Sequence, residues 1–423
     1  MTPDSNEAIT ATLSAPSAAT PPVARGADAH GTEQWALQKL YDAAGRPPIR
    51  VEVQNGPSIG PRAADAAATL HVHSRRALFK LLAFPDYYLG ACYTSGEAHV
   101  EGSLVNGLEA LYRALARARP PGLLQRQLTQ WLYKPQRNTL AESRQNIYSH
   151  YNIGNDFYRL WLDKQLVYTC AYFRTPGHTL EQAQADKMDL VCRKLRLRPG
   201  ERVVDVGCGW GALALHMARH YGVEVHAYNI ATEQIHFARE RAQSLGLHKQ
   251  VRFVEDDYRN IQGQYDVFVS IGMLEHVGRD HFAAFGDVMD RSLTPAGRGL
   301  LHFIGRTYPT PLNPWIERHI FPGGYPPALS ELAPMLETAN FSILDVENLR
   351  LHYAKTLEHW LARFDASSEA ISAMFDAPFV RAWRFYLSGS LAAFRTGDMH
   401  LFQLLFNRNG INDQPWTREG LYR

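Results

Sequence analysis

The sequence predicts an α/β fold, a parallel sheet flanked by helices, preceded by a small α+β domain. After about residue 146, strand-like apolar runs alternate with helix-like ones, which is the pattern of a parallel sheet covered by helices. One of these runs breaks into three glycines before a helical stretch, and glycines let such a turn approach a ligand closely. The expected strands are residues 202–206, 223–228, 251–254, 267–271, 299–304 and 399–407.

Composition divides the chain into four stretches. Residues 1–31 are dominated by Ala, Pro, Thr and Ser with few large apolar residues, which predicts a disordered tail. Residues 32–119 alternate β-like runs (49–53) with helical ones (75–82), which predicts a small α+β domain. We assign 120–145 to a basic linker and 146–423 to the larger domain.

The segment around this linker is basic and partly apolar. Between residues 111 and 140 there are six basic residues and no acidic one, interleaved with leucines and a tryptophan. Basic side chains near an anionic membrane surface gain about 1 kcal/mol each, and Leu and Trp can enter the interface. The segment is therefore a candidate membrane contact, with an ordinary amphipathic helix between domains as the alternative. Its basic residues are Arg113, Arg117, Arg119, Arg126, Lys134 and Arg137.

The overall composition excludes several classes of protein. The chain has 423 residues, 45% of them hydrophobic and 20% charged, which is enough for two domains with separate cores. No apolar stretch is long enough to span a membrane and no secretory signal begins the chain, so we expect a cytoplasmic protein. Its four cysteines form no CxxC pair and no metal-ligand cluster. A net charge of +2 does not indicate nucleic acid.

The glycine-rich run is a candidate cofactor site. Residues 203–211, VVDVGCGWG, form a buried strand containing Asp205 that ends in Gly207, Gly209 and Gly211. The spacing is GxGxG, without the third glycine of the dinucleotide GxGxxG pattern. By itself such a turn can serve NAD, FAD or S-adenosylmethionine, or it can bind nothing.

Polar residues follow the next two expected strands. Asn229 and Gln234 come after the second strand, where a nucleotide-binding sheet presents a side chain to the ribose hydroxyls. Glu255, Asp256 and Asp257 follow the third strand, where a carboxylate can accept from the adenine amino group. The alternative for the acidic cluster is a solvated loop.

With these features the chain resembles the cyclopropane fatty acid synthase family, a branch of the S-adenosylmethionine-dependent methyltransferases. The resemblance covers most of the chain, and its motifs occur in the expected order. The small N-terminal domain also looks like the extra domain of the bacterial members that modify phospholipids. The motifs are SHYNIGND (149–156), YTCAYF (168–173), the glycine turn, GMLEHVG (272–278), LHFIG (301–305), PWI (314–316), IFP (320–322) and FR (394–395).

The resemblance implies a Rossmann-like class I methyltransferase sheet with helical insertions and two sets of site residues. One set should contact S-adenosylmethionine: Tyr168, Thr169, Asp205, Gly207, Gly209, Gly211, Asn229, Gln234, Asp256 and Asp257. The other should hold a bicarbonate ion that acts as the general base: Cys170, Glu275, His302, Ile304 and Tyr353. Two positions depart from the family: Ser390 replaces a cysteine once considered catalytic, and Asn229 stands where relatives often have threonine.

The implied reaction adds a one-carbon unit to an unsaturated acyl chain of a membrane phospholipid and closes a cyclopropane ring. Methyl transfer to an alkene leaves a carbocation, which needs aromatic faces nearby and a base. The candidate aromatic residues are Tyr172, Phe173, Trp315, Tyr353 and Trp360. The resemblance also implies peripheral association with the inner face of the membrane and a possible homodimer, although no residue pattern indicates the dimer.

Three other functions share part of this pattern. A methyltransferase that methylates a carbon atom of an acyl group without ring closure would use the same residues and give a methyl- or methylene-branched lipid. A lipid-binding protein with a decayed transferase site is disfavoured by the intact glycine turn and the complete base-site set. A small-molecule or nucleic-acid methyltransferase is disfavoured by the lipid-type motifs and the absence of a nucleic-acid signature.

Overall fold

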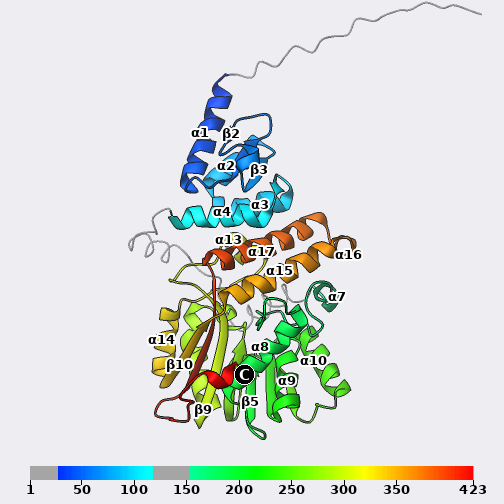
Figure 1. Cartoon of the computed structure of the whole chain (residues 1–423), viewed down its shortest axis with the longest axis vertical. Helices are drawn as coiled ribbons and strands as arrows, with labels where there is room; N and C mark the ends of the chain where they lie inside the picture. Colours follow the sequence, from blue (N-terminus) through cyan, green and yellow to red (C-terminus); the bar gives the residue numbers. More distant parts are fainter. Residues whose placement is uncertain (1–26, 118–152, 423) are drawn as a thin grey trace, which may run out of the picture.

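A computed structural model describes residues 27–117 and 153–422 of the chain (Figure 1). The N-terminal part contains a four-stranded sheet in the order β2-β1-β3-β4, in which β1 and β3 are parallel. Its core lies between the sheet and its helices and includes Leu37, Val51, Val72 and Leu78. The elements are α1 (Ala27–Ala43), β1 (Arg50–Val53), β2 (Ser58–Ile59), β3 (Ala68–Val72), α2 (Arg75–Ala83), α3 (Pro85–Ser95), β4 (Ala98–Gly102) and α4 (Leu104–Arg117).

The expected α+β character of this part agrees with the structure, and one boundary differs. Helix α1 begins at Ala27, inside the stretch 1–31 that the sequence predicts to be a disordered tail. The rest of that stretch lies outside the described residues, as does the whole linker, 120–145. Of the basic segment 111–140, only residues up to Arg117 are described, and they form the end of α4.

The larger part is built on a seven-stranded sheet in the order β10-β11-β9-β8-β5-β6-β7. Strands β9, β8, β5, β6 and β7 are parallel, whereas β11 and β10 run antiparallel at one side. All six strands expected from the sequence are present. They are β5 (Arg202–Val206), β6 (Glu224–Asn229), β7 (Val251–Glu255), β8 (Tyr265–Ile271), β9 (Leu293–Gly305) and β11 (His400–Arg408).

The sequence analysis missed β10 (Phe341–Asn348). This is an edge strand with only Phe341 buried, and Ile343 and Val346 are exposed. Its sequence, FSILDVEN, carries no continuous apolar run because one side of the strand has no neighbour to pack against. Pairing with β11 therefore defines this strand.

Helices cover both faces of the sheet, and each face has its own apolar core. Helix α8 begins with a capping box in which the Thr179 side chain accepts from Gln182 N and the Gln182 side chain accepts from Thr179 N. The covering helices are α8 (Leu180–Leu195), α9 (Ala212–Tyr221), α10 (Thr232–Ser244), α12 (Phe282–Ser292) and α14 (Leu329–Thr338).

A layer of further helices lies between the sheet and the N-terminal part (Figure 1). It contains α7 (Asn155–Arg159), α13 (Pro314–His319), α15 (Arg350–Ala366), α16 (Ser368–Met374) and α17 (Ala377–Thr396). Helices α3 and α4 pack on α17, and α3 also packs on α13. A Cβ on Gly90 of α3 would lie 2.5 Å from the Trp315 ring of α13, so glycine permits this close contact. The layer encloses an aromatic core above the sheet.

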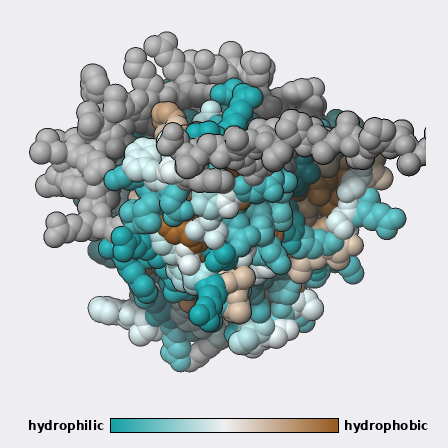
Figure 2. Space-filling model, turned by 90° about the horizontal axis from the view of Figure 1, so that it is seen from above, coloured by the Kyte–Doolittle hydropathy of each residue, from teal (hydrophilic) through white to brown (hydrophobic). Residues whose placement is uncertain are grey.

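Figure 2 views the molecule from the side of the N-terminal part. On the coloured surface, hydrophilic residues predominate and hydrophobic ones form small patches. Within 27–117 and 153–422, no helix is both long enough and apolar enough to cross a bilayer.

Candidate active site

The glycine turn follows β5 and leads directly into α9. Gly207, Gly209 and Gly211 all have positive φ, at 86°, 53° and 80°, a conformation that favours glycine. A Cβ on Gly211 would lie 2.5 Å from Phe253 Cζ, whereas a Cβ on Gly209 would meet no atom of the described residues within 4 Å. The backbone at Gly209 therefore borders open space, which fits close approach of a ligand.

Asn229 and Gln234 meet beside this turn. Asn229 Nδ2 donates to Gln234 Oε1 at 2.7 Å and approaches Gly209 O at 3.4 Å. Gln234 is buried, and its Nε2 has no hydrogen-bond partner in the described parts of the chain. A buried amide donor without a partner is costly, and a ribose hydroxyl at this position would satisfy it. The structure thus brings the three predicted residues together.

The acidic cluster after β7 is held mainly by local bonds. Glu255 accepts from the Thr232 hydroxyl at 2.7 Å. Asp256 Oδ1 accepts from Asp257 N and from Asn260 Nδ2, both at 2.8 Å. Asp257 is buried and caps a short 3₁₀ turn. Asp256 and Asp257 lie at the carboxyl end of β7, next to that of β6, so the predicted adenine contact has the required place in the sheet.

Two buried ionisable groups occur at the cofactor residues: Asp205, a member of the predicted set, and Lys187, which is not. Asp205 is 1% exposed, and burial raises its pKa to about 7 although Lys187 lowers it. Lys187 of α8 is 2% exposed, and burial lowers its pKa to about 8. Its ammonium donates to Thr169 Oγ1 at 3.0 Å. The sequence analysis missed Lys187, although its position among the apolar residues of α8 offered a signal.

Gly272, directly after β8, joins the cofactor residues to the base-site residues. Its amide donates to His302 O at 2.7 Å. A Cβ on Gly272, where φ is 70°, would lie 2.7 Å from Thr169 Cγ2. The segment containing Thr169 therefore packs directly on the ends of β8 and β9.

Glu275 and Ile304 are bonded to each other. Glu275 lies in α11 (Leu274–Val277), and its Oε1 accepts from Ile304 N at 3.4 Å. Burial raises the pKa of Glu275 to about 7. Its second oxygen, Oε2, is buried and finds no partner among residues 27–117 and 153–422.

His302 lies two residues before Ile304 on β9 and is 1% exposed. Its Nδ1 is bonded to Gln403 Nε2 at 3.0 Å, and its Nε2 has no partner in the described structure. Burial holds the pKa of His302 well below its usual value, with Lys187 and Lys194 acting in the same direction. The site thus contains one buried carboxylate oxygen and one buried ring nitrogen that are both available to a polar ligand.

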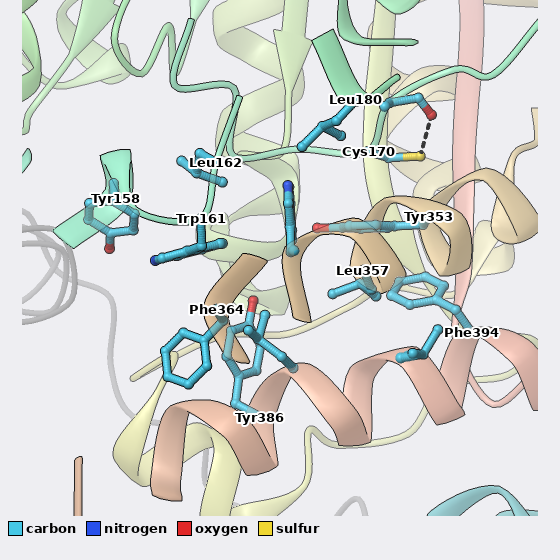
Figure 3. Packing of buried hydrophobic residues seen from close by; sticks show 14 of the residues in the cluster. Tyr158, Trp161, Leu162, Cys170, Leu180, Tyr353, Leu357, Phe364, Tyr386 and Phe394 are labelled. Carbon is cyan, nitrogen blue, oxygen red and sulfur yellow. Dashed lines mark hydrogen bonds between the residues drawn. The ribbon is translucent and has the colours of Figure 1, made fainter. Parts of the chain in front are cut away.

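Cys170 and Tyr353 belong to the aromatic core above these residues (Figure 3). Cys170 is fully buried, its thiol donates to Ala171 O at 3.1 Å, and burial raises its pKa. A thiol in this environment is a poor nucleophile. The Tyr353 ring packs on Phe394, with ring centroids 4.4 Å apart, and on Trp360 at 5.9 Å.

The candidate aromatic residues divide into separate groups. Tyr353 and Trp360 contact each other, and Trp360 also contacts Tyr168, whose hydroxyl is 2.8 Å from that of Tyr386. Tyr172 and Phe173 instead stack on histidines of α15, and Trp315 packs on Phe385. Tyr353 and Trp360 are therefore the pair that directly joins the predicted base-site and cofactor residues.

Comparison with known proteins identifies the family. The model of the mycolic acid cyclopropane synthetase family matches residues 138–404, which include every predicted site residue. The chain belongs to this family. As a cyclopropane synthetase family member, it is an S-adenosylmethionine-dependent methyltransferase, and its sheet is that of the class I methyltransferases.

Two curated relatives and one solved structure show how much of this chain is similar to known proteins. The cyclopropane-fatty-acyl-phospholipid synthase of Escherichia coli K12 is 40% identical over 265 residues, 62% of this chain and 68% of that protein. A probable fatty acid methyltransferase of Pseudomonas putida is 40% identical over 285 residues, 65% of this chain and 72% of that protein. The structure of mycolic acid cyclopropane synthase CmaA1 with SAH and CTAB aligns with a TM-score of 0.60 and 30% identity, covering 63% of this chain and 98% of that one.

Proposed function

We propose that this protein transfers a methylene group from S-adenosylmethionine to the cis double bond of an unsaturated phospholipid acyl chain and forms a cyclopropane ring. The observation that carries the proposal is a pair of buried polar atoms, Glu275 Oε2 and His302 Nε2, for which the described residues offer no hydrogen-bond partner. Glu275 lies two residues after Met273, which a Cβ on Gly207 of the glycine turn would meet at 2.9 Å, and His302 lies two residues before Ile304, which packs on the aromatic core. An anionic base and an apolar chain would both find suitable surroundings there.

The cofactor supplies an electrophilic methyl group, and the protein positions it. Among the described residues, none would meet a Cβ on Gly209 within 4 Å and none accepts from Gln234 Nε2, so the turn and this amide donor are both available to the cofactor. Lys187 holds the Thr169 hydroxyl by a hydrogen bond. These residues would fix the cofactor against the alkene, and accurate positioning is the main contribution that a protein can make when a reactive cofactor performs the chemistry.

A bicarbonate ion would supply the base in the same site. Glu275 would accept a hydrogen bond from the bicarbonate hydroxyl, while His302 Nε2 and the Ile304 amide would donate to its oxygens. The Ile304 amide donates to Glu275, so this donor points toward the same carboxylate. A protein carboxylate acting alone could trap the cation as an ester, whereas a small bound base can leave after protonation.

Tyr353 and Trp360 would stabilise the positive charge on the acyl chain. Both are buried and in mutual contact. An aromatic face is worth up to about 2 kcal/mol to a desolvated cation. Water exclusion by the surrounding core also protects the cation from capture.

A methyl- or methylene-branched product is the second candidate. The observation that favours it is the 40% identity with the Pseudomonas putida probable fatty acid methyltransferase, equal to that with the Escherichia coli synthase. Both outcomes begin with the same methyl transfer and differ only in how the cation loses its proton. The residues that hold the base therefore decide the product.

The substrate reaches the site from a membrane surface in this proposal. The segment 111–140 supplies basic and apolar residues for that contact. A homodimer would place two such segments on one membrane.

The deciding experiment is incubation of the protein with S-adenosylmethionine and unsaturated phospholipid vesicles, followed by proton NMR of the recovered acyl chains. Cyclopropane signals support the proposal. Branched-chain signals without them establish the second candidate, and unmodified chains overturn both. Mass alone does not distinguish the products, because each adds one CH2.

A further inference from the structure

A buried series of hydrogen bonds runs from Lys194 through Gln403 to His302. Lys194 Nζ of α8 donates to Gln403 Oε1 of β11 at 2.7 Å. Gln403 Nε2 lies 3.0 Å from His302 Nδ1 on β9. All three residues are 3% exposed or less. Neither Lys194 nor Gln403 belongs to the two predicted sets of site residues.

The charge on Lys194 determines which way the Gln403 amide points. An ammonium group has only donors, so the atom of Gln403 that faces it must be the carbonyl oxygen. The amide nitrogen then faces His302 and can only donate. Lys194 Nζ also donates to Glu347 Oε2 at 2.5 Å.

The amide in turn determines where His302 carries its proton. A neutral imidazole has one N–H and one lone pair. Because Gln403 donates to Nδ1, the lone pair is on Nδ1 and the proton is on Nε2. A second proton on Nδ1 would face the Gln403 N–H directly, and the charge would be buried near Lys187 and Lys194.

We infer that Lys194 and Gln403 are positioning residues that hold His302 as the neutral Nε2–H tautomer. His302 then donates a hydrogen bond to an anion in the site and does not accept the proton that leaves the substrate. This inference rests on the proposed function for the identity of the anion. The tautomer itself follows from the hydrogen bonds alone.

The direct test is 15N NMR of the protein with 15N-labelled histidine, with the His302 signals assigned by their loss in His302→Gln. The two nitrogens of a neutral imidazole have well-separated shifts, so the spectrum identifies the protonated one. At neutral pH we expect protonated Nε2 and unprotonated Nδ1. Protonated Nδ1, or a doubly protonated ring, overturns the inference, and this result needs no variant of Lys194 or Gln403.

Gln403→Glu tests the cause. A carboxylate accepts where the amide donates, so His302 should move to the Nδ1–H or doubly protonated form and turnover should fall at least tenfold. Gln250→Glu adds the same charge at an exposed position of the catalytic part and should change neither signal nor turnover. An unchanged His302 spectrum in folded Gln403→Glu contradicts the role of Gln403.

Lys194→Met and Lys194→Arg test the first link. Without the cation the amide is free to turn, so Lys194→Met should give a mixture of His302 tautomers and lower kcat more than it raises KM. Lys194→Arg keeps a donor and should restore the Nε2–H form. A Lys194→Met spectrum identical to that of wild type refutes the role of Lys194. Because these spectra need no substrate, failure of the ring-forming assay alone would reject the proposed function and leave the tautomer result standing.

Discussion

The amide of Gly272 donates to the carbonyl of His302 at 2.7 Å, which holds the residue after β8 against the end of β9. The same glycine packs its Cα side on Thr169. A single glycine that has no room for a side chain therefore lies between Thr169 of the predicted cofactor set and His302 of the predicted base set.

Replacing Gly272 by Ala should damage both sets. Its Cβ would lie 2.7 Å from Thr169 Cγ2 and its φ of 70° is strained for alanine, which together cost about 2–4 kcal/mol. We expect a matching loss in the free energy of unfolding and weaker cofactor binding by calorimetry. Gly209→Ala is the stability control for backbone strain alone, because its Cβ would meet none of the residues that the structure describes within 4 Å. It should cost about 1 kcal/mol of stability yet also weaken cofactor binding. Equal stability of the two variants would refute the steric argument.

Glu275→Gln and His302→Ala should each lower turnover by orders of magnitude while cofactor binding survives. Neither side chain belongs to the set predicted to bind the cofactor, and both hold the base in the proposed function. Initial rates with vesicle substrate and cofactor titration by calorimetry give the two quantities. Near-normal turnover in both variants would eliminate the bicarbonate assignment.

Glu275 should also make the stability depend on pH. Its folded-state pKa is raised from 4.5 to about 7, so the unfolded state ionises first as pH rises through that window. The free energy of unfolding therefore falls between about pH 4.5 and pH 7, by about 3 kcal/mol in total, and stays lower above it. Glu275→Gln lacks this loss.

Thermal unfolding of wild type and Glu275→Gln at pH 5 and pH 8 checks this prediction. The variant should be more stable than wild type at pH 8, and the difference should shrink at pH 5. His302→Gln serves as a control for removing an ionisable group from the same site. A difference between wild type and Glu275→Gln that does not change with pH would show that Glu275 ionises normally.

Neutralising the basic segment should weaken membrane binding. Substituting glutamine for Arg117, Arg119, Arg126 and Arg137 removes four positive charges, each worth about 1 kcal/mol near an anionic surface. Sedimentation with anionic vesicles at moderate salt should show a clear loss of bound protein. Lys164, Arg219, Lys249 and Arg252 are exposed, and their replacement is the control with the same change in net charge. Equal binding by both quadruple variants would reject the segment as the membrane contact.

Local patterns were sufficient for most of the fold. The parallel strands are buried on both faces and therefore appear as continuous apolar runs, and the glycines after β5 mark the turn by their spacing. The edge strand β10 was not predicted because three of its eight residues are exposed and only one is buried. The sequence analysis also did not predict where α1 begins, because its first residues have the same composition as the preceding tail.

The sequence by itself determined the sheet, the glycine turn and, through family motifs, the candidate residues around them. Only the tertiary structure revealed that Gly272 separates Thr169 from His302, that Lys187 lies buried beside the cofactor residues, and that Lys194 acts on His302 through Gln403. Lys194 and Gln403 are 209 residues apart, and Gln403 and His302 are 101 apart. Local sequence patterns report the conformation of neighbouring residues, whereas the proton position on a buried histidine depends on groups that only folding brings within hydrogen-bond distance.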